Sequence, residues 1–182
     1  MSRTAGPDGY ALIADLYDEV GPYRERPDIV FYVEAAVQAG GPVLEVGCGT
    51  GRVLIPSARA GARMVGVDLS APMLAICRAK LRNESEEVRS AVQLVQADMR
   101  EFALSRKFAL ATIPFRPFQH LMTTEDQLSC LATIRTHLID GGRLILDVFN
   151  PSLDALVNRP EGREFGDEPE FTMPGGRRVV RT

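Results

Sequence analysis

The chain has 182 residues, and its 45% hydrophobic and 25% charged side chains are typical of one globular domain. No apolar run approaches the roughly 18 residues that span a bilayer, and the N-terminus lacks the apolar stretch of a secretory signal. We therefore expect a cytoplasmic protein without a membrane partner. The net charge of −3 and three widely spaced cysteines favour neither a nucleic-acid partner nor a metal site.

The first forty residues are predicted to form a helical extension. Ile13, Leu16, Tyr17 and Val20 fall at helical spacing, and the same spacing returns over residues 29–37. Glycines at positions 40 and 41 end the second helix, because glycine tolerates the left-handed conformation that follows a helix.

From residue 41 onwards, apolar runs of strand length alternate with helical segments. The predicted strands cover 42–47, 64–68, 92–96, 108–113 and 143–149. The predicted helices cover 51–61, a segment from the N-cap Ser70 to about Arg82, and a segment to about Leu138 that opens with a capping box of Thr124 and Gln127. This alternation predicts a doubly wound α/β domain over 41–150, with a mostly parallel sheet covered on both faces.

The last segment, 151–182, differs in character from the rest. It offers a short helix at 152–158, a loop rich in Pro, Gly and Glu, and two short strands about a glycine turn. We expect an incomplete hairpin here. The predicted organisation is therefore a helical extension at 1–40, an α/β domain at 41–150 and this C-terminal segment.

The glycine-rich segment VLEVGCGTGR at 43–52 is the strongest local signal in the chain. Gly47, Gly49 and Gly51 follow a strand and open a helix, where the backbone must turn sharply and let a ligand approach. The dinucleotide fingerprint needs glycine or alanine at position 52, which is arginine here. Glu45 would repel a pyrophosphate, so the loop suits a ligand with a cationic head.

Two more acids end the next predicted strands. Asp68 is placed to accept hydrogen bonds from both hydroxyls of a ribose, and Asp98 is placed to accept from an exocyclic amine. Leu69 and Met99, beside these acids, can hold a flat base between them. The carboxyl ends of parallel strands meet at one edge of a sheet, so we expect a common site for these residues.

Residues 40–150 resemble the class I S-adenosylmethionine-dependent methyltransferases, with E-V-G-C-G-T-G close to the family's commonest first motif. The resemblance implies a Rossmann-like fold and S-adenosylmethionine as cofactor. The resemblance assigns the methionine end to Glu45, Gly47, Gly49 and Gly51, the ribose to Asp68, and the adenine to Asp98 and Met99. The predicted cofactor site also includes Cys48, Leu69 and Pro114. The stretch 113–121 aligns with the family's fourth motif, which faces the methyl group, and 137–151 resembles its helix, glycine turn and fifth strand.

One departure from the family concerns the end of the sheet. The family sheet normally continues with two more strands after the fifth, and this sequence lacks most of that segment. We therefore expect C-terminal strands that are truncated, with the fifth strand as an exposed edge. Such an edge favours instability or association into a homodimer.

Several candidate residues have both a functional and a structural interpretation. His120 is the candidate catalytic base near the methyl site, and a packed histidine is the alternative. Tyr10, Tyr17 and Tyr23 lie in the N-terminal helical segment, and Tyr17 is expected either to line the cofactor site as part of a lid or to pack on the sheet. Cys48 is interpreted as a small residue between glycines rather than a nucleophile. Glu45 is also a candidate ion-pair partner of Arg52.

The favoured function is methyl transfer from S-adenosylmethionine to O, N or C of a small-molecule acceptor. The alternatives are a non-catalytic, truncated S-adenosylmethionine-binding protein and a nicotinamide-dependent oxidoreductase on the same fold. Arg52 argues against the oxidoreductase, because it replaces the third glycine of the dinucleotide fingerprint.

Overall fold

The computed structural model describes residues 14–19, 26–150, 171, 172, 176, 178 and 179. Tyr10, Tyr23 and the predicted helix at 152–158 lie outside the described residues. Within the described part, none of the helices has the length and apolar character needed to span a bilayer.

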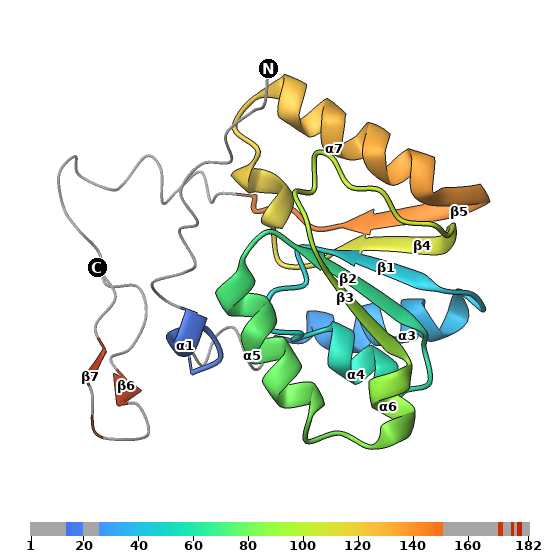
Figure 1. The fold of residues 1–182 in the computed structure, drawn as a ribbon. Coiled ribbons are helices and arrows are strands. Elements are labelled where there is room, and N and C mark those ends of the chain that lie inside the picture. The colour runs from blue at the N-terminus through green and yellow to red at the C-terminus, as the bar shows by residue number, and fades with distance from the viewer. Residues whose placement is uncertain (1–13, 20–25, 151–170, 173–175, 177, 180–182) are drawn as a thin grey trace, which may run out of the picture.

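A five-stranded parallel sheet forms the centre of the molecule, with strand order β3-β2-β1-β4-β5 (Figure 1). Its strands are β1 (Val43–Val46), β2 (Met64–Asp68), β3 (Val92–Gln96), β4 (Phe108–Ile113) and β5 (Leu138–Leu146). Chain order reverses between β1 and β4, which are neighbours although two strands separate them in sequence. Crevices form at such a reversal, outside the carboxyl ends of the strands, so this edge is where a ligand is expected.

Helices cover both faces of the sheet, and α7 lies on the face opposite α3, α4 and α5 (Figure 1). The helices are α1 (Ala14–Tyr17), α3 (Asp28–Gln38), α4 (Leu54–Arg59), α5 (Ala71–Leu81), α6 (Glu86–Ser90), the 3₁₀-helix η1 (Pro117–His120) and α7 (Thr124–His137). The predicted doubly wound α/β fold is confirmed. The helix α6 was not predicted, because five residues are too few to show a helical period.

Two apolar cores lie on the two faces of the sheet. Val43, Met64 and Leu110 belong to the core under α3, α4 and α5, while the adjacent residues Leu44 and Val65 belong to the core under α7. Successive side chains of a strand point to opposite faces, so both faces of β1 are buried. This burial explains why β1 and β2 are almost continuous apolar runs in the sequence.

The helix caps confirm one prediction and correct another. The Ser70 hydroxyl accepts a hydrogen bond from the Met73 amide at 3.4 Å and caps α5 as predicted. The cap of α7 is Thr123 rather than Thr124, since the Thr123 hydroxyl accepts from the Asp126 amide at 3.1 Å. Gln127 instead donates to the Leu121 carbonyl at 2.9 Å. Two adjacent threonines can each cap a helix, and the path of the preceding chain decides between them.

The strand β5 occupies 138–146 rather than the predicted 143–149. It begins at Leu138, opposite Phe108, and its pairing with β4 shifts register between Phe108 and Leu110. Gly141, with φ +75°, lies within this irregular stretch. At the other end the chain leaves the strand at Asp147, whose side chain bonds outside the sheet.

The predicted C-terminal strand pair is confirmed as β6 (Phe171–Thr172) and β7 (Arg178–Val179), which pair antiparallel in a sheet of their own. In Figure 1 these two strands lie beyond α1, apart from the central sheet. The described helix α1 ends at Tyr17 and is followed by a turn at 18–19, while α3 agrees closely with the second prediction, and Gly40 follows α3 at φ +65° as expected.

Candidate functional site

The loop between β1 and α4 has a conformation that requires its glycines. Gly47, Gly49 and Gly51 have φ values of +73°, +52° and +84°, a region that other residues rarely adopt. The Gly47 amide donates to the Val67 carbonyl at 2.7 Å, and the Gly51 amide donates to the Cys48 carbonyl at 2.9 Å. The loop is therefore hydrogen-bonded to the end of β2 as well as to itself.

Close packing adds a second requirement for glycine in this loop. A Cβ at position 47 would lie 2.6 Å from the Cβ of Pro117 in η1. A Cβ at position 51 would lie 2.6 Å from the Cys77 sulfur in α5. The loop thus lies between the segment that follows β4 and the helix that follows β2, and both segments reach the same edge of the sheet.

Asp68 ends β2 and connects the neighbouring loops. Its Oδ2 accepts from the Gly49 amide at 2.7 Å, and its Oδ1 accepts from the Ser70 amide at 2.8 Å. Both carboxylate oxygens are therefore oriented by backbone groups beside the glycine loop. This is the position from which the sequence predicted ribose binding, and that role stays a prediction.

Glu45 is the most unusual residue of the site. Its side chain is 2% exposed, and none of the described residues forms a hydrogen bond with its Oε2 atom. Burial raises the pKa of this carboxyl to about 8, although the Arg52 charge and the Leu54 amide act in the opposite direction. The Arg52 guanidinium does not pair with it, because it forms a bidentate pair with Asp28 at 2.8 and 2.9 Å. Glu45 is thus a buried acid beside the glycine loop that forms no ion pair with any described residue.

Asp98 follows β3 and binds an arginine that the sequence analysis overlooked. Its Oδ2 lies 2.6 Å from Arg100 Nη2, and its Oδ1 accepts from the Arg100 amide at 2.9 Å. Arg100 also reaches Asp126 of α7 at 3.2 Å. Asp98 and Arg100 are only two positions apart in the sequence, and this short separation could have indicated the ion pair. The predicted contact between Asp98 and adenine stays a prediction.

The residues predicted to hold the base differ in exposure. Leu69 is 43% exposed after β2, and Met99 is partly buried against the core under α7.

Cys48 is buried at 4% exposure, and burial raises the pKa of its thiol well above the ordinary value, which fits a packed residue rather than a nucleophile. Its amide donates to Val67 at 3.1 Å and its carbonyl accepts from Gly51, so both backbone groups are engaged within the loop.

The turn after β4 lies at the same carboxyl edge of the sheet as the glycine loop. Pro114 is buried, and Phe115 and Arg116 have φ values of +63° and +73°, uncommon for residues with side chains. The Tyr17 ring of α1 contacts the Phe115 ring edge-on, with centroids 6.4 Å apart. Tyr17 therefore reaches the turn after β4. His120, at the end of η1, is exposed, and its catalytic role stays a prediction.

The helix α1 is attached to the glycine loop by polar contacts that the sequence analysis did not predict. Asp18, just after α1, lies 2.6 Å from the Lys80 ammonium and accepts from the Thr50 hydroxyl at 2.7 Å. Lys80 also donates to the Thr50 carbonyl at 3.0 Å. These contacts hold the end of α1 beside the loop.

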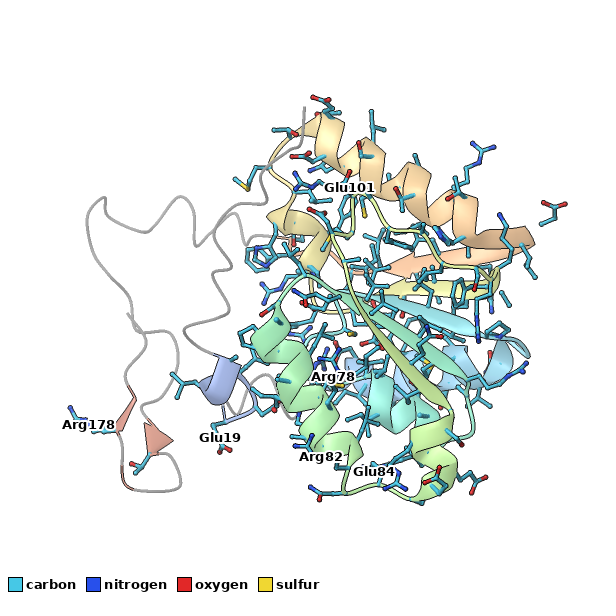
Figure 2. The ribbon with its side chains drawn as sticks, viewed as in Figure 1. Glu19, Arg78, Arg82, Glu84, Glu101 and Arg178 are labelled. Carbon is cyan, nitrogen blue, oxygen red and sulfur yellow. The ribbon has the colours of Figure 1, made fainter. Side chains whose placement is uncertain are left out.

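Arg59 of α4 pairs with Glu84, which follows α5, and both residues line a pocket that also includes Gly51. Glu84 accepts from Arg59 Nε at 2.9 Å, and Figure 2 shows Glu84 and Arg82 near the C-terminal end of α5. The positive-φ glycines and the acids Glu45, Asp68 and Asp98 lie at or near the carboxyl ends of β1, β2 and β3. A parallel sheet with these features defines a Rossmann-like protein with a nucleoside-type cofactor site.

The comparisons with known proteins identify the family. The methyltransferase-domain family matches residues 43–142. The dTDP-3-amino-3,6-dideoxy-alpha-D-glucopyranose N,N-dimethyltransferase of Streptomyces fradiae is 32% identical over 154 residues, which are 80% of this chain and 57% of that protein. The chain belongs to the class I S-adenosylmethionine-dependent methyltransferases. It spans about half the length of the curated relatives it matches.

Solved structures agree with this family. The CcbJ methyltransferase from Streptomyces caelestis superposes with a TM-score of 0.66 at 32% identity, covering 74% of this chain and 54% of that one. The glycopeptide N-methyltransferase MtfA in complex with S-adenosylmethionine gives a TM-score of 0.62 at 30% identity, covering 86% and 66%. The cofactor of this family is S-adenosylmethionine, so the oxidoreductase alternative is not favoured.

The residues present fit that cofactor. S-adenosylmethionine carries a cationic ammonium and a sulfonium, and the unpaired, buried Oε2 of Glu45 is a group that a cation would stabilise. The positive-φ glycines give the loop the sharp turn from β1 into α4 that the family's first motif requires. The chemistry of the acids and the form of the loop are therefore both compatible with this ligand.

Proposed function

We propose that the chain is an S-adenosylmethionine-dependent methyltransferase that modifies a small molecule. The observation that carries the proposal is the buried carboxyl of Glu45, whose Oε2 has no hydrogen-bond partner in the described part of the chain, beside a glycine loop whose Gly49 amide is bonded to Asp68. A cationic nucleoside satisfies both acids at once, because its charge suits Glu45 and its sugar hydroxyls suit Asp68. The matched relatives include N-methyltransferases, which supports an amine nitrogen as the acceptor atom among the O, N and C alternatives.

Each site residue has a role in the proposal. Glu45 and the loop glycines hold the methionine end, Asp68 holds the ribose, and Leu69, Asp98 and Met99 hold the adenine. Pro114 closes the site on the side of β4. The cofactor supplies a methyl group on sulfonium, which is already electrophilic.

The remaining work of the chain is to align the acceptor and exclude water, which lowers the barrier without further chemical groups. Tyr17 and Phe115 form the aromatic contact that shields this edge. His120 takes a proton only where the acceptor arrives protonated, and its exposure allows that proton to pass to solvent. The cytoplasmic location and the homodimer stay predictions from the sequence.

Isothermal titration with S-adenosylhomocysteine tests the proposal. We expect Asp68→Ala to weaken binding at least tenfold, Asp68→Asn to weaken it less, and the exposed control Asp140→Ala to leave it unchanged. Circular dichroism verifies that each variant is folded. Wild-type affinity in a folded Asp68→Ala variant, or no binding to the wild-type chain, would contradict the proposal.

Methyl transfer itself is tested by mass spectrometry of acceptor panels incubated with S-adenosylmethionine. The panel contains amino sugars and peptides with free N-termini, which follow the names of two matched relatives, and phenols as acceptors with an oxygen nucleophile. Methylated amines support the nitrogen assignment. Binding of the cofactor without transfer to any member would favour the non-catalytic alternative.

A further inference from the structure

The turn after β4 contains two consecutive residues in the left-handed region, Phe115 at φ +63° and Arg116 at φ +73°. Neither residue is a glycine, so the surrounding structure must hold this conformation in place. Left-handed residues of this kind concentrate at functional sites, where they direct a side chain that a relaxed turn would direct elsewhere.

A single carboxylate holds the turn. Asp147 Oδ1 accepts from the Phe115 amide at 2.7 Å and from the Tyr32 hydroxyl at 2.7 Å. Tyr32 is 2% exposed in α3, and Asp147 directly follows β5. Three segments that are distant in the sequence thereby determine where residue 116 lies.

The Arg116 guanidinium lies over aromatic rings and has no acidic partner among the described residues. It lies 4.7 Å from the centroid of the Phe115 ring and 5.3 Å from that of the Phe149 ring. A cation–π contact uses the charge of a guanidinium and does not use its five N–H donors in conventional hydrogen bonds. Arg26 and Arg52 also approach the Phe115 ring, at 4.8 and 5.2 Å, but both pair with Asp28.

Arg116 lies beside the loop assigned to the cofactor. The next residue, Pro117, is so near Gly47 that a Cβ added there would be 2.6 Å from the proline Cβ. A group bound to Arg116 would therefore sit next to the glycine loop, on the side of the sheet edge formed by β4.

We infer that Arg116 binds an oxyanion of the methyl acceptor, either a phosphate or a carboxylate. This inference rests on the proposed function. The fork of N–H donors matches two oxygens of either anion, and three guanidinium groups around one ring make this edge locally cationic. Arg116 is then a specificity-determining residue, which selects acidic acceptors over neutral ones.

Titration with two simple probes, inorganic pyrophosphate and malonate, tests the assignment in the presence of saturating S-adenosylhomocysteine. We expect the wild-type chain to bind at least one probe, Arg116→Gln to bind it at least tenfold more weakly, and Arg116→Lys to fall between them. The matched control is Arg106→Gln, an exposed arginine before β4 at the opposite edge, with wild-type affinity expected. Binding of pyrophosphate alone assigns a phosphate, and binding of malonate alone assigns a carboxylate.

The inference is overturned if neither probe binds the wild-type chain, or if Arg116→Gln binds as tightly as wild type. Titration of the same variants with S-adenosylhomocysteine separates this result from failure of the proposed function. Absence of cofactor binding in the wild-type chain contradicts the proposed function itself. Normal cofactor binding without anion binding contradicts only the role of Arg116.

Discussion

The Gly49 amide donates a 2.7 Å hydrogen bond to Asp68 Oδ2, so the glycine loop after β1 is tied to the acid that ends β2. The bond joins the segment expected to contact the methionine end to the residue expected to contact the ribose. A substitution at Gly49 or Asp68 is therefore expected to alter both parts of the proposed cofactor site.

Gly47→Ala should destabilise the fold more than Gly40→Ala. Both glycines have a positive φ, +73° and +65°, which costs an alanine about 1 to 2 kcal/mol. Only Gly47 faces an obstacle, since its Cβ would meet Pro117 at 2.6 Å while Gly40 has open space. We expect an additional loss of about 1 to 3 kcal/mol for Gly47→Ala in denaturant unfolding. Equal losses for the two variants would show that the contact with Pro117 does not constrain the loop.

Glu45 should make the stability of the ligand-free protein fall as pH rises. The pKa of this carboxyl is about 8 in the folded protein, against an ordinary value of 4.5. Between these pH values the folded protein keeps a proton that the unfolded chain has released, so raising the pH favours unfolding. The full effect is on the order of 4 kcal/mol between pH 4.5 and 8.

The measurement is the free energy of unfolding across that pH range for the wild-type chain and Glu45→Gln. The glutamine has no proton to release, so its profile should lack this decline. Parallel profiles for the two proteins would contradict the assignment of the decline to Glu45.

Cofactor binding should release a proton from Glu45 at neutral pH. A cationic ammonium beside the carboxyl favours its ionised form and lowers its pKa, so the proton leaves as the ligand enters. Calorimetric titration with S-adenosylhomocysteine in two buffers of different ionisation enthalpy should give different apparent enthalpies. Glu45→Gln should abolish the buffer dependence. Buffer-independent enthalpies in the wild-type chain would show that Glu45 does not meet the charge of the ligand.

Asp147→Ala should cost more stability than Tyr32→Phe. Removing the carboxylate leaves the Phe115 amide and the buried Tyr32 hydroxyl without their acceptor, a loss of roughly 2 to 4 kcal/mol. Tyr32→Phe removes one of the two hydrogen bonds and leaves Asp147 bound to Phe115, so about 1 kcal/mol is expected. Denaturant unfolding of both variants and of Asp147→Asn measures the difference. A loss no larger in Asp147→Ala than in Tyr32→Phe would show that Asp147 does not hold the turn.

Local sequence signals located most of the sheet and the centre of the site. The strands at 64–68, 92–96 and 108–113 have the predicted bounds, because short apolar runs between turn residues define buried strands well. Ser70 caps α5 as predicted, since capping depends on neighbours along the chain. The glycines at 47, 49 and 51 have the positive φ values that their spacing indicated.

The sequence did not indicate which side chains from distant segments pair with one another. Arg52 follows the glycine loop and was a candidate partner for Glu45, yet it binds Asp28 of α3 at 2.8 Å. The strand β5 ends at Leu146 rather than 149, where Asp147 bonds to Phe115 and Tyr32. Such partners are chosen by the packing of helices on the sheet, which leaves no periodic pattern in the sequence.

The sequence alone determined the family, the order of strands and helices, and the acids and glycines of the cofactor loop, because these depend on hydrophobic period and on backbone conformations that only glycine adopts readily. Only the tertiary structure decided that Glu45 is buried with one oxygen unbonded by the described residues, that Asp98 binds Arg100, and that the turn at 115–116 directs Arg116, which has no acidic partner among those residues, to the same edge. These properties arise from burial and from contacts between segments far apart in the chain, so they exist only once the sheet has formed.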